Sequence, residues 1–106
     1  MFKMISTLCL IFLMLATNTY GNASKGKRIY KKKMQKICGF SAAKMTRKHT
    51  QAEWESLYEG GKFLEEIHHI CPDLDTHSLK RKWVKHLYDM SLKYAKDGVA
   101  PNGCND

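Results

Sequence analysis

The sequence lacks the cysteine motifs of two common protein functions. It contains no Cys-x-x-Cys pair, which is the motif of dithiol redox enzymes, and no Cys-x-x-Cys-His, which attaches haem covalently. A paired set of catalytic carboxylates is missing as well, because the adjacent Glu65 and Glu66 point in different directions on a helix. We therefore expect a protein that is not an enzyme.

The alternation of apolar and polar residues that marks β-strands is also absent. Apolar residues recur instead at helical spacing. The segment Thr50-Gln-Ala-Glu53 is typical of a capping box, Gly60-Gly61 can end a helix, and Pro72 stops one. Helices are expected at about 25–38, 51–59, 62–71 and 77–96, with a helical turn at 41–45. The predicted class is all-α, a small four-helix domain.

The first predicted helix has an apolar face and a basic face. The residues expected to face the core are Ile29, Tyr30, Met34, Ile37 and Cys38. The residues of the basic face are Lys27, Arg28, Lys31, Lys32 and Lys36. Two interpretations of the basic face stay open: a face that is simply solvated, or a docking face for an acidic protein partner or an anionic envelope surface.

Charge is distributed unevenly along the chain. The formal net charge is +8, and no acidic residue occurs between Lys25 and Lys48. Acidic residues gather in 53–75, so the basic helix could be balanced within the molecule. Basic residues return at Lys80-Arg81-Lys82, which raises nucleic-acid binding as an option. The acidic middle of the chain and its expected export argue against that option, and we expect no nucleic-acid partner.

The N-terminal segment has the layout of a secretory signal peptide. Lys3 precedes an apolar run from Ile5 to Ala16, and small and polar residues follow up to Ala23. Cleavage after Gly21 or after Ala23 fits this layout, and an uncleaved anchor is the alternative. The predicted organisation is a signal peptide at 1–23 and one helical domain at 24–106 that ends in an irregular tail. We expect a periplasmic or secreted protein whose mature chain has no membrane span.

Three cysteines remain after the expected cleavage, namely Cys38, Cys71 and Cys104. An exported chain permits disulfides, and a domain this small often needs one. Three thiols allow one bridge with one free thiol, or an intermolecular pair. A Cys38–Cys71 bridge would stabilise the fold by roughly 3.5–4 kcal/mol on the chain-entropy model. Pairing of Cys104 with either partner stays open, because connectivity does not follow from sequence.

The start of the mature chain resembles a known helix. Gly26-Lys-Arg-Ile-Tyr30-Lys-Lys-Lys is similar to the N-terminal helix of small bacterial c-type cytochromes, and the segment from Leu87 to Ala95 resembles their closing helix. The resemblance implies that the two helices cross near Gly26. It fails at the haem motif. Met34, Ile37 and Cys38 stand where that family has its two haem cysteines and its histidine ligand.

Further motifs extend the resemblance over the mature chain. Lys-x-Cys-Gly-Phe-Ser, Lys-His-Thr-Gln-x-Glu-Trp-Glu, Gly-Lys-Phe and Ile-Cys-Pro are similar to motifs of little-characterised exported proteins of Campylobacterota. Those proteins often carry the label cytochrome c, and the resemblance implies a periplasmic location. The resemblance assigns no haem ligands to this chain, because the residues of the haem motif are missing. We expect no cofactor, with non-covalent haem on His49, His86 or Met90 as the alternative.

Three functional hypotheses follow. The first is a cytochrome-c-like helical protein without covalent haem, acting as a non-enzymatic partner-binding or accessory protein of periplasmic electron transfer. The second is a disulfide-stapled basic binding protein unrelated to redox chemistry. The third is a metal-binding protein that uses Cys38, Cys71 and His68, since His68 and Cys71 lie three residues apart on one predicted helix. A surface histidine beside a structural cysteine is the simpler interpretation of that last pair.

Overall fold

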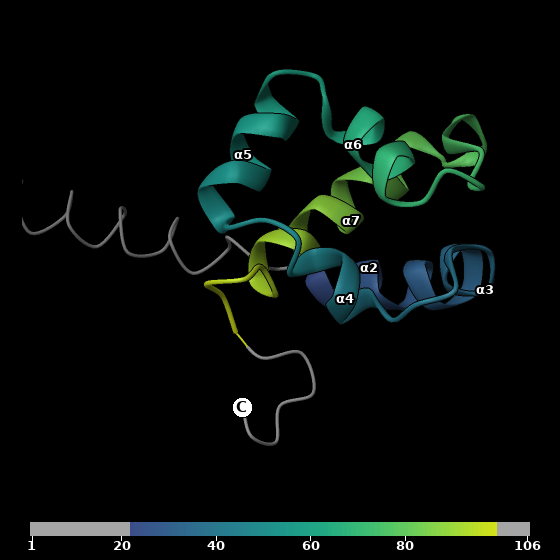
Figure 1. The fold of residues 1–106 in the computed structure, drawn as a ribbon, viewed down its shortest axis with the longest axis horizontal. Helices are drawn as coiled ribbons and strands as arrows, with labels where there is room; N and C mark the ends of the chain where they lie inside the picture. Colours follow the sequence, from purple (N-terminus) through teal and green to yellow (C-terminus); the bar gives the residue numbers. More distant parts are fainter. Residues whose placement is uncertain (1–21, 100–106) are drawn as a thin grey trace, which may run out of the picture.

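The computed structural model describes residues 22–99. The cleavage region up to residue 21, Cys104 and the tail after Val99 lie outside this range, so the signal-peptide prediction is not addressed. Within 22–99 the chain is helical and contains no strand, which confirms the all-α prediction (Figure 1). In the same range, no helix combines the length and the apolar character needed to cross a bilayer.

The first helix is continuous but not uniform. It consists of α2 (Ala23–Ile29), the π-helical turn η1 (Tyr30–Met34) and α3 (Gln35–Cys38), and it ends at Gly39 with φ 82°. The Gln35 N–H donates to the Tyr30 carbonyl, the wide bond that defines a π-turn. This turn adds a residue and rotates the remainder of the helix. The prediction that Ile37 faces the core is therefore wrong, since its side chain is 48% exposed.

The middle helices begin and end where the sequence signals predict. The short α4 (Ala42–Thr46) and α5 (Gln51–Glu59) are followed by α6 (Phe63–Ile70), which ends just before Pro72. The capping box is confirmed. The Glu53 N–H donates to Thr50 Oγ1 over 3.2 Å, and the Thr50 N–H donates to Glu53 Oε1 over 2.9 Å.

The last helix is shorter than predicted. Helix α7 runs over Arg81–Lys93 rather than 77–96. The Asp75 side chain caps a separate 3-10 turn, η2 (Thr76–Ser78), by accepting from the His77 N–H over 3.0 Å. Leu79 then adopts an extended backbone conformation, with ψ 123°, and its side chain is buried. The helical spacing of the sequence does not reveal this break between η2 and α7 at the buried Leu79.

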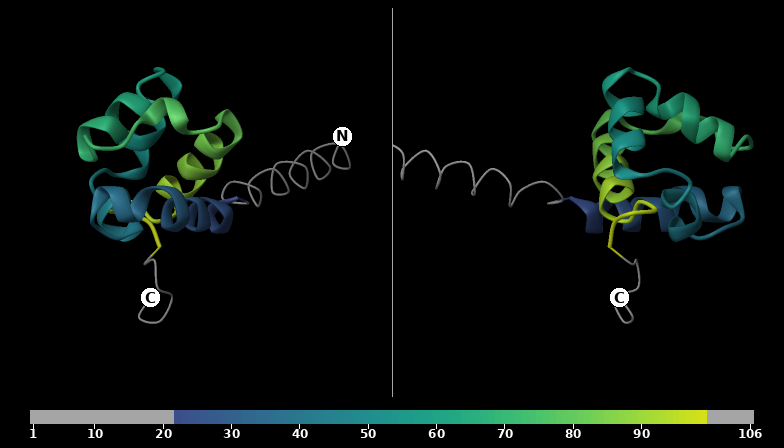
Figure 2. Two further views of the ribbon diagram at one scale, coloured as in Figure 1. Left: turned by 90° about the vertical axis from the view of Figure 1, so that its right-hand side faces the viewer. Right: turned by 60° about the vertical axis from the view of Figure 1, so that its left-hand side comes forward.

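Helix α7 lies at the centre of the domain. Helices α5 and α6 pack on one side of it, and the first helix and α4 lie on the other (Figures 1 and 2). The first helix crosses α7 at Gly26. A Cβ atom at Gly26 would collide with the His86 carbonyl oxygen and lie 2.8 Å from Met90 Cβ. The fully buried core side chains include Trp54, Tyr30, Met34, Met45, Ile67, Leu87 and Met90.

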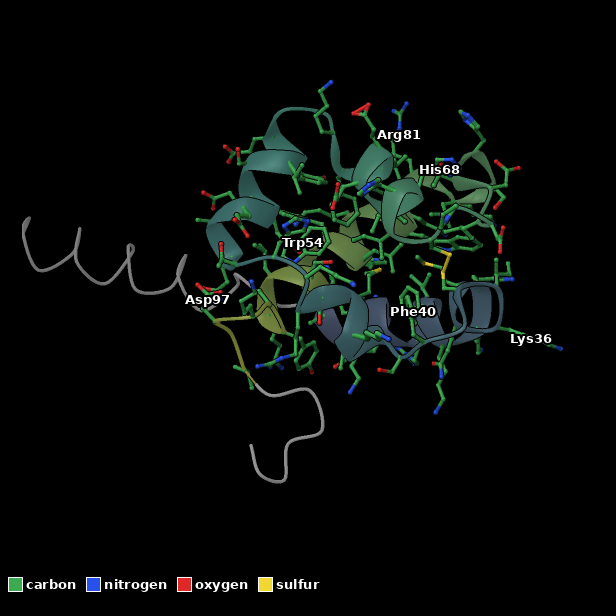
Figure 3. The ribbon with its side chains drawn as sticks, viewed as in Figure 1. Lys36, Phe40, Trp54, His68, Arg81 and Asp97 are labelled. Atoms are coloured by element: carbon green, nitrogen blue, oxygen red, sulfur yellow. A yellow bond between two sulfur atoms is a disulfide. The ribbon has the colours of Figure 1, made fainter. Side chains whose placement is uncertain are left out.

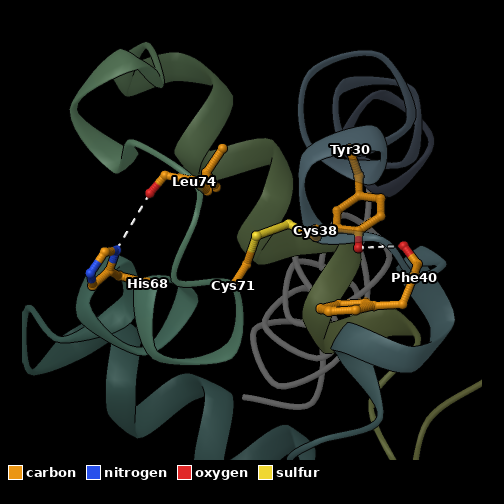
Figure 4. Close-up of a disulfide and its surroundings, with 6 residues drawn as sticks. All are labelled: Tyr30, Cys38, Phe40, His68, Cys71 and Leu74. Atoms are coloured by element: carbon orange, nitrogen blue, oxygen red, sulfur yellow. Dashed lines mark hydrogen bonds between the residues drawn. A yellow bond between two sulfur atoms is a disulfide. The ribbon is translucent and has the colours of Figure 1, made fainter.

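A disulfide joins the two halves at the end remote from this crossing. Cys38 at the end of α3 is bonded to Cys71 after α6, with 5.2 Å between their Cα atoms (Figure 4). This bond selects one of the pairings left open by the sequence. Beside it, the Tyr30 hydroxyl donates to the Phe40 carbonyl over 2.7 Å and holds the chain as it leaves the first helix (Figure 4).

Candidate functional site

A groove of about 460 Å³ lies between the first helix and α7. We call it the basic groove. Its lining residues are Lys25, Arg28, Ile29, Lys32 and Lys33 from the first helix, and Lys82, Trp83 and His86 from α7. Lys25, Arg28 and Lys32 line one wall because residues three and four apart share a helix face. The close crossing at Gly26 brings the opposite wall, on α7, against them.

The positive charge of the basic groove is not neutralised within the described part of the chain. None of its five lysine and arginine side chains forms an ion pair with an acidic residue of 22–99. The Lys85–Asp89 pair, with 2.7 Å between Nζ and Oδ1, lies outside the lining of the groove. No ion pair among residues 22–99 joins the first helix to the acidic residues of α5 and α6. Direct ion pairs with α5 and α6 therefore do not balance the groove-lining cations of this helix within residues 22–99.

Trp83 is a half-buried aromatic residue in the groove wall. The Lys33 Nζ lies 5.4 Å from the centre of its ring and the Lys80 Nζ lies 5.1 Å from it, both in cation–π geometry. The indole N–H has no hydrogen-bond partner among residues 22–99, whereas that of Trp54 donates to the Thr46 carbonyl over 2.8 Å. Trp83 therefore anchors two lysines and leaves one N–H donor unused.

His86 is half-buried where the groove meets the helix crossing. Its Nδ1 is buried and has no hydrogen-bond partner, the one buried side-chain nitrogen or oxygen of residues 22–99 in that condition. The Nε2 also has no partner in this range, and it is not among the buried atoms. The imidazole thus presents Nε2 as its accessible nitrogen, in a groove whose other polar side-chain groups are five cations and the Trp83 indole N–H.

Only part of the predicted basic face lines the basic groove. Of its members, Arg28 and Lys32 line the basic groove. Lys27 instead lies over the ring of Tyr94, 5.2 Å from its centre. Lys31 and Lys36 are exposed outside the groove lining, and Figure 3 shows Lys36 pointing away from the body of the protein. The sequence did not predict that α7 supplies the second wall, although Lys82 belongs to the basic cluster Lys80-Arg81-Lys82.

A second polar cluster lies between α5 and α6. His49 Nε2 lies 2.6 Å from Glu66 Oε2, and His49 Nδ1 lies 3.4 Å from Glu53 Oε1. The backbone hydrogen bond from Thr50, reinforced by His49, holds the pKa of Glu53 below its usual value. The His49 ring also meets Trp54 edge-on, with 4.9 Å between ring centres. This cluster is fully explained as a structural link that fastens the start of α5 to α6.

The three residues of the metal-binding hypothesis have other partners in this structure. Cys38 and Cys71 are consumed by the disulfide, and His68 Nδ1 instead lies 3.4 Å from the Leu74 carbonyl (Figure 4). Among the residues that the structure describes, no three histidine, cysteine or acidic side chains are grouped to hold a metal ion.

The candidate haem ligands do not form a pair. Met90 is fully buried at the helix crossing, and His49 is bonded to Glu66. His86 is the candidate that keeps an accessible ligating atom. These three candidates therefore do not supply two ligands to one haem.

Comparisons with known proteins do not identify the chain. No protein-family model matches it, and no match is found among curated proteins or among solved structures. The class of the protein therefore rests on its own features. It is an all-α domain with a Cys38–Cys71 disulfide and a basic groove.

Proposed function

We propose that the protein is a non-enzymatic binding protein that docks an acidic protein partner on the basic groove. The observation that carries the proposal is the set of five groove cations without acidic partners in 22–99. Clustered like charges repel one another, and an acidic partner relieves that repulsion while steering its own approach.

The cellular setting forms a second part of this proposal. We place the protein in the periplasm or outside the cell, as an accessory of electron transfer that carries no covalent haem. This setting rests on the resemblance of the Gly26–Lys33 segment to cytochrome helices and on the signal-like N-terminus. The basic groove supports the binding role independently of the setting, because it requires only an acidic partner.

The test uses poly-L-glutamate as the acidic probe and calorimetry to measure its affinity. The double variant Arg28→Glu/Lys32→Glu reverses two groove cations. The matched control, Arg47→Glu/Lys48→Glu, changes the net charge equally at two exposed residues outside the groove. We expect the groove variant to bind at least tenfold more weakly, a loss of about 1.4 kcal/mol, and the control to stay within about threefold.

Two results would contradict the proposal. Equal losses in both variants would mean that net charge, and not the groove, drives binding. Binding to vesicles rich in anionic phospholipid without binding to poly-L-glutamate would indicate an anionic envelope surface instead of a protein partner. The affinity of the native protein should also fall steeply between 50 and 300 mM salt, since exposed charges are screened over a Debye length of about 8 Å at physiological ionic strength.

A further inference from the structure

The basic groove contains two hydrogen-bond donors that its electrostatic role does not require. They are the indole N–H of Trp83 and the imidazole of His86, and neither has a partner among residues 22–99. We propose that these two groups form a directional seat for a side-chain carboxylate of the acidic partner. This inference rests on the proposed function and adds a specific contact to it.

The burial of His86 Nδ1 determines which nitrogen carries the proton. A proton on Nδ1 would be a buried donor with no acceptor, which is more costly than a buried lone pair without a donor. The neutral ring therefore holds its proton on Nε2, the accessible nitrogen. In this tautomer His86 offers one N–H donor and no acceptor to the groove, which matches a carboxylate oxygen.

The two lysines over the Trp83 ring limit which part of this side chain a ligand can contact. Lys33 and Lys80 lie over its ring, so a ligand cannot stack there without displacing them. The edge of the indole, with its N–H, is the part left for a ligand. Trp83 and His86 are three residues apart on α7 and therefore share a helix face. Both donors thus come from the same wall of the groove.

The cations make a polypeptide the occupant that fits best. Arg28 and Lys32 lie on the wall opposite, and Lys82 lies beside Trp83. The groove is therefore positive along the wall formed by the first helix, from Lys25 to Lys33, with Lys82 on the facing wall, which suits a segment that carries successive carboxylates. Exposed Lys31 and Lys36 continue the positive charge along the first helix. A single small anion would engage only part of this surface.

The experiment separates hydrogen bonding from charge. His86→Leu removes the donor, and His86→Gln retains an uncharged N–H donor at similar reach. We expect His86→Leu to weaken poly-L-glutamate binding about tenfold with an unchanged salt dependence, and His86→Gln to stay within about threefold of the native protein. His77→Leu, on an exposed histidine outside the basic groove, is the matched control and should bind normally.

Fluorescence supplies a second readout. Trp54 is fully buried, so a change in tryptophan emission on binding reports Trp83. Unchanged affinity in His86→Leu, together with a large loss in Arg28→Glu/Lys32→Glu, would contradict the proposed carboxylate seat. The proposed function would still hold in that case. Failure of native protein to bind poly-L-glutamate would overturn both. Equally tight binding of inorganic phosphate or anionic vesicles, with the same dependence on His86, would overturn the assignment to a polypeptide carboxylate.

Discussion

At the scale of single residues, Gly26 sets how closely the first and last helices approach. Alanine favours a helix over glycine by about 1 kcal/mol, yet a Cβ here would strike the His86 carbonyl and Met90. We expect Gly26→Ala to lower the free energy of unfolding by about 2 kcal/mol, as measured by urea denaturation followed by circular dichroism. Ser24→Ala, an exposed position in the same helix, should be neutral or slightly stabilising. Equal stability of both variants would contradict the close crossing.

His86 carries a cost in stability that its proposed role explains. Its buried Nδ1 makes no hydrogen bond, and leaving a buried polar group unsatisfied costs about 1–3 kcal/mol. Replacement by leucine removes that group. We therefore expect His86→Leu to raise the free energy of unfolding by roughly 0.5–1 kcal/mol, while it weakens binding. Thermal unfolding measures this gain, and a destabilised His86→Leu would show that the ring is retained for packing.

Tyr30 makes the fold sensitive to alkali. Burial raises the pKa of Tyr30 to about 12, and burial with nearby acidic residues raises that of Tyr88 to about 12 as well. The pKa of tyrosine in the unfolded chain is about 10. The stability linked to these phenols is therefore complete below pH 10 and is lost as pH rises from 10 towards 12. Tyr30→Phe should lose less stability between pH 9 and pH 11 than the native protein, and an identical loss would contradict this linkage.

At the scale of helices, the sequence predicted the helix ends that depend on neighbouring residues. The Thr50–Glu53 capping box and the stop before Pro72 were predicted because both depend on neighbouring residues. The exposure of Ile37 was not predicted, because the π-turn at Tyr30–Met34 adds a residue and rotates the turn after it away from the position that regular α-helical spacing gives. Tyr30 and Met34, at the two ends of this turn, are fully buried, and such core packing is not encoded in the local sequence.

The Cys38–Cys71 disulfide links elements that are otherwise far apart in the chain. Its cysteines are separated by 33 positions, and closing such a loop contributes about 3.5–4 kcal/mol on the chain-entropy model. We expect Cys38→Ala/Cys71→Ala to lose about this much stability. The urea midpoint of the native protein under reducing conditions should fall to that of the variant. A native midpoint that does not respond to reduction would contradict a structural role for the bridge.

At the scale of the whole molecule, the basic groove joins residues that are distant in sequence. Lysines of the first helix were predicted as a binding face, and Arg28 and Lys32 do line the groove. Trp83 and His86 could not be assigned to it, because the sequence does not state which part of α7 lies against the first helix. The groove arises from the crossing at Gly26 and is therefore a property of tertiary structure.

The clustered positive charge of the basic groove gives the whole domain an unusual response to salt. Like charges three and four residues apart on a helix repel, and Lys25, Arg28 and Lys32 form such a series. Salt screens this repulsion in the folded state more than in the expanded chain. Few ion pairs oppose the effect, since the described lysine–carboxylate pairs are Lys62–Glu65 and Lys85–Asp89. Sodium chloride should therefore stabilise this protein, whereas it weakens domains held by surface ion pairs.

We expect the free energy of unfolding to rise by about 1 kcal/mol between 20 and 300 mM sodium chloride, in urea titrations at constant pH. The variant Arg28→Gln/Lys32→Gln removes two of the repelling charges, so it should be more stable at low salt and gain less from added salt. Arg47→Gln/Lys48→Gln is the matched control and should respond as the native protein does. A native stability that falls with salt would show that attractive pairs outweigh the repulsion around the groove. Poly-L-glutamate, by contrast, should stabilise the native protein at low salt more than the groove variant, because a ligand stabilises a fold according to its affinity for the folded state.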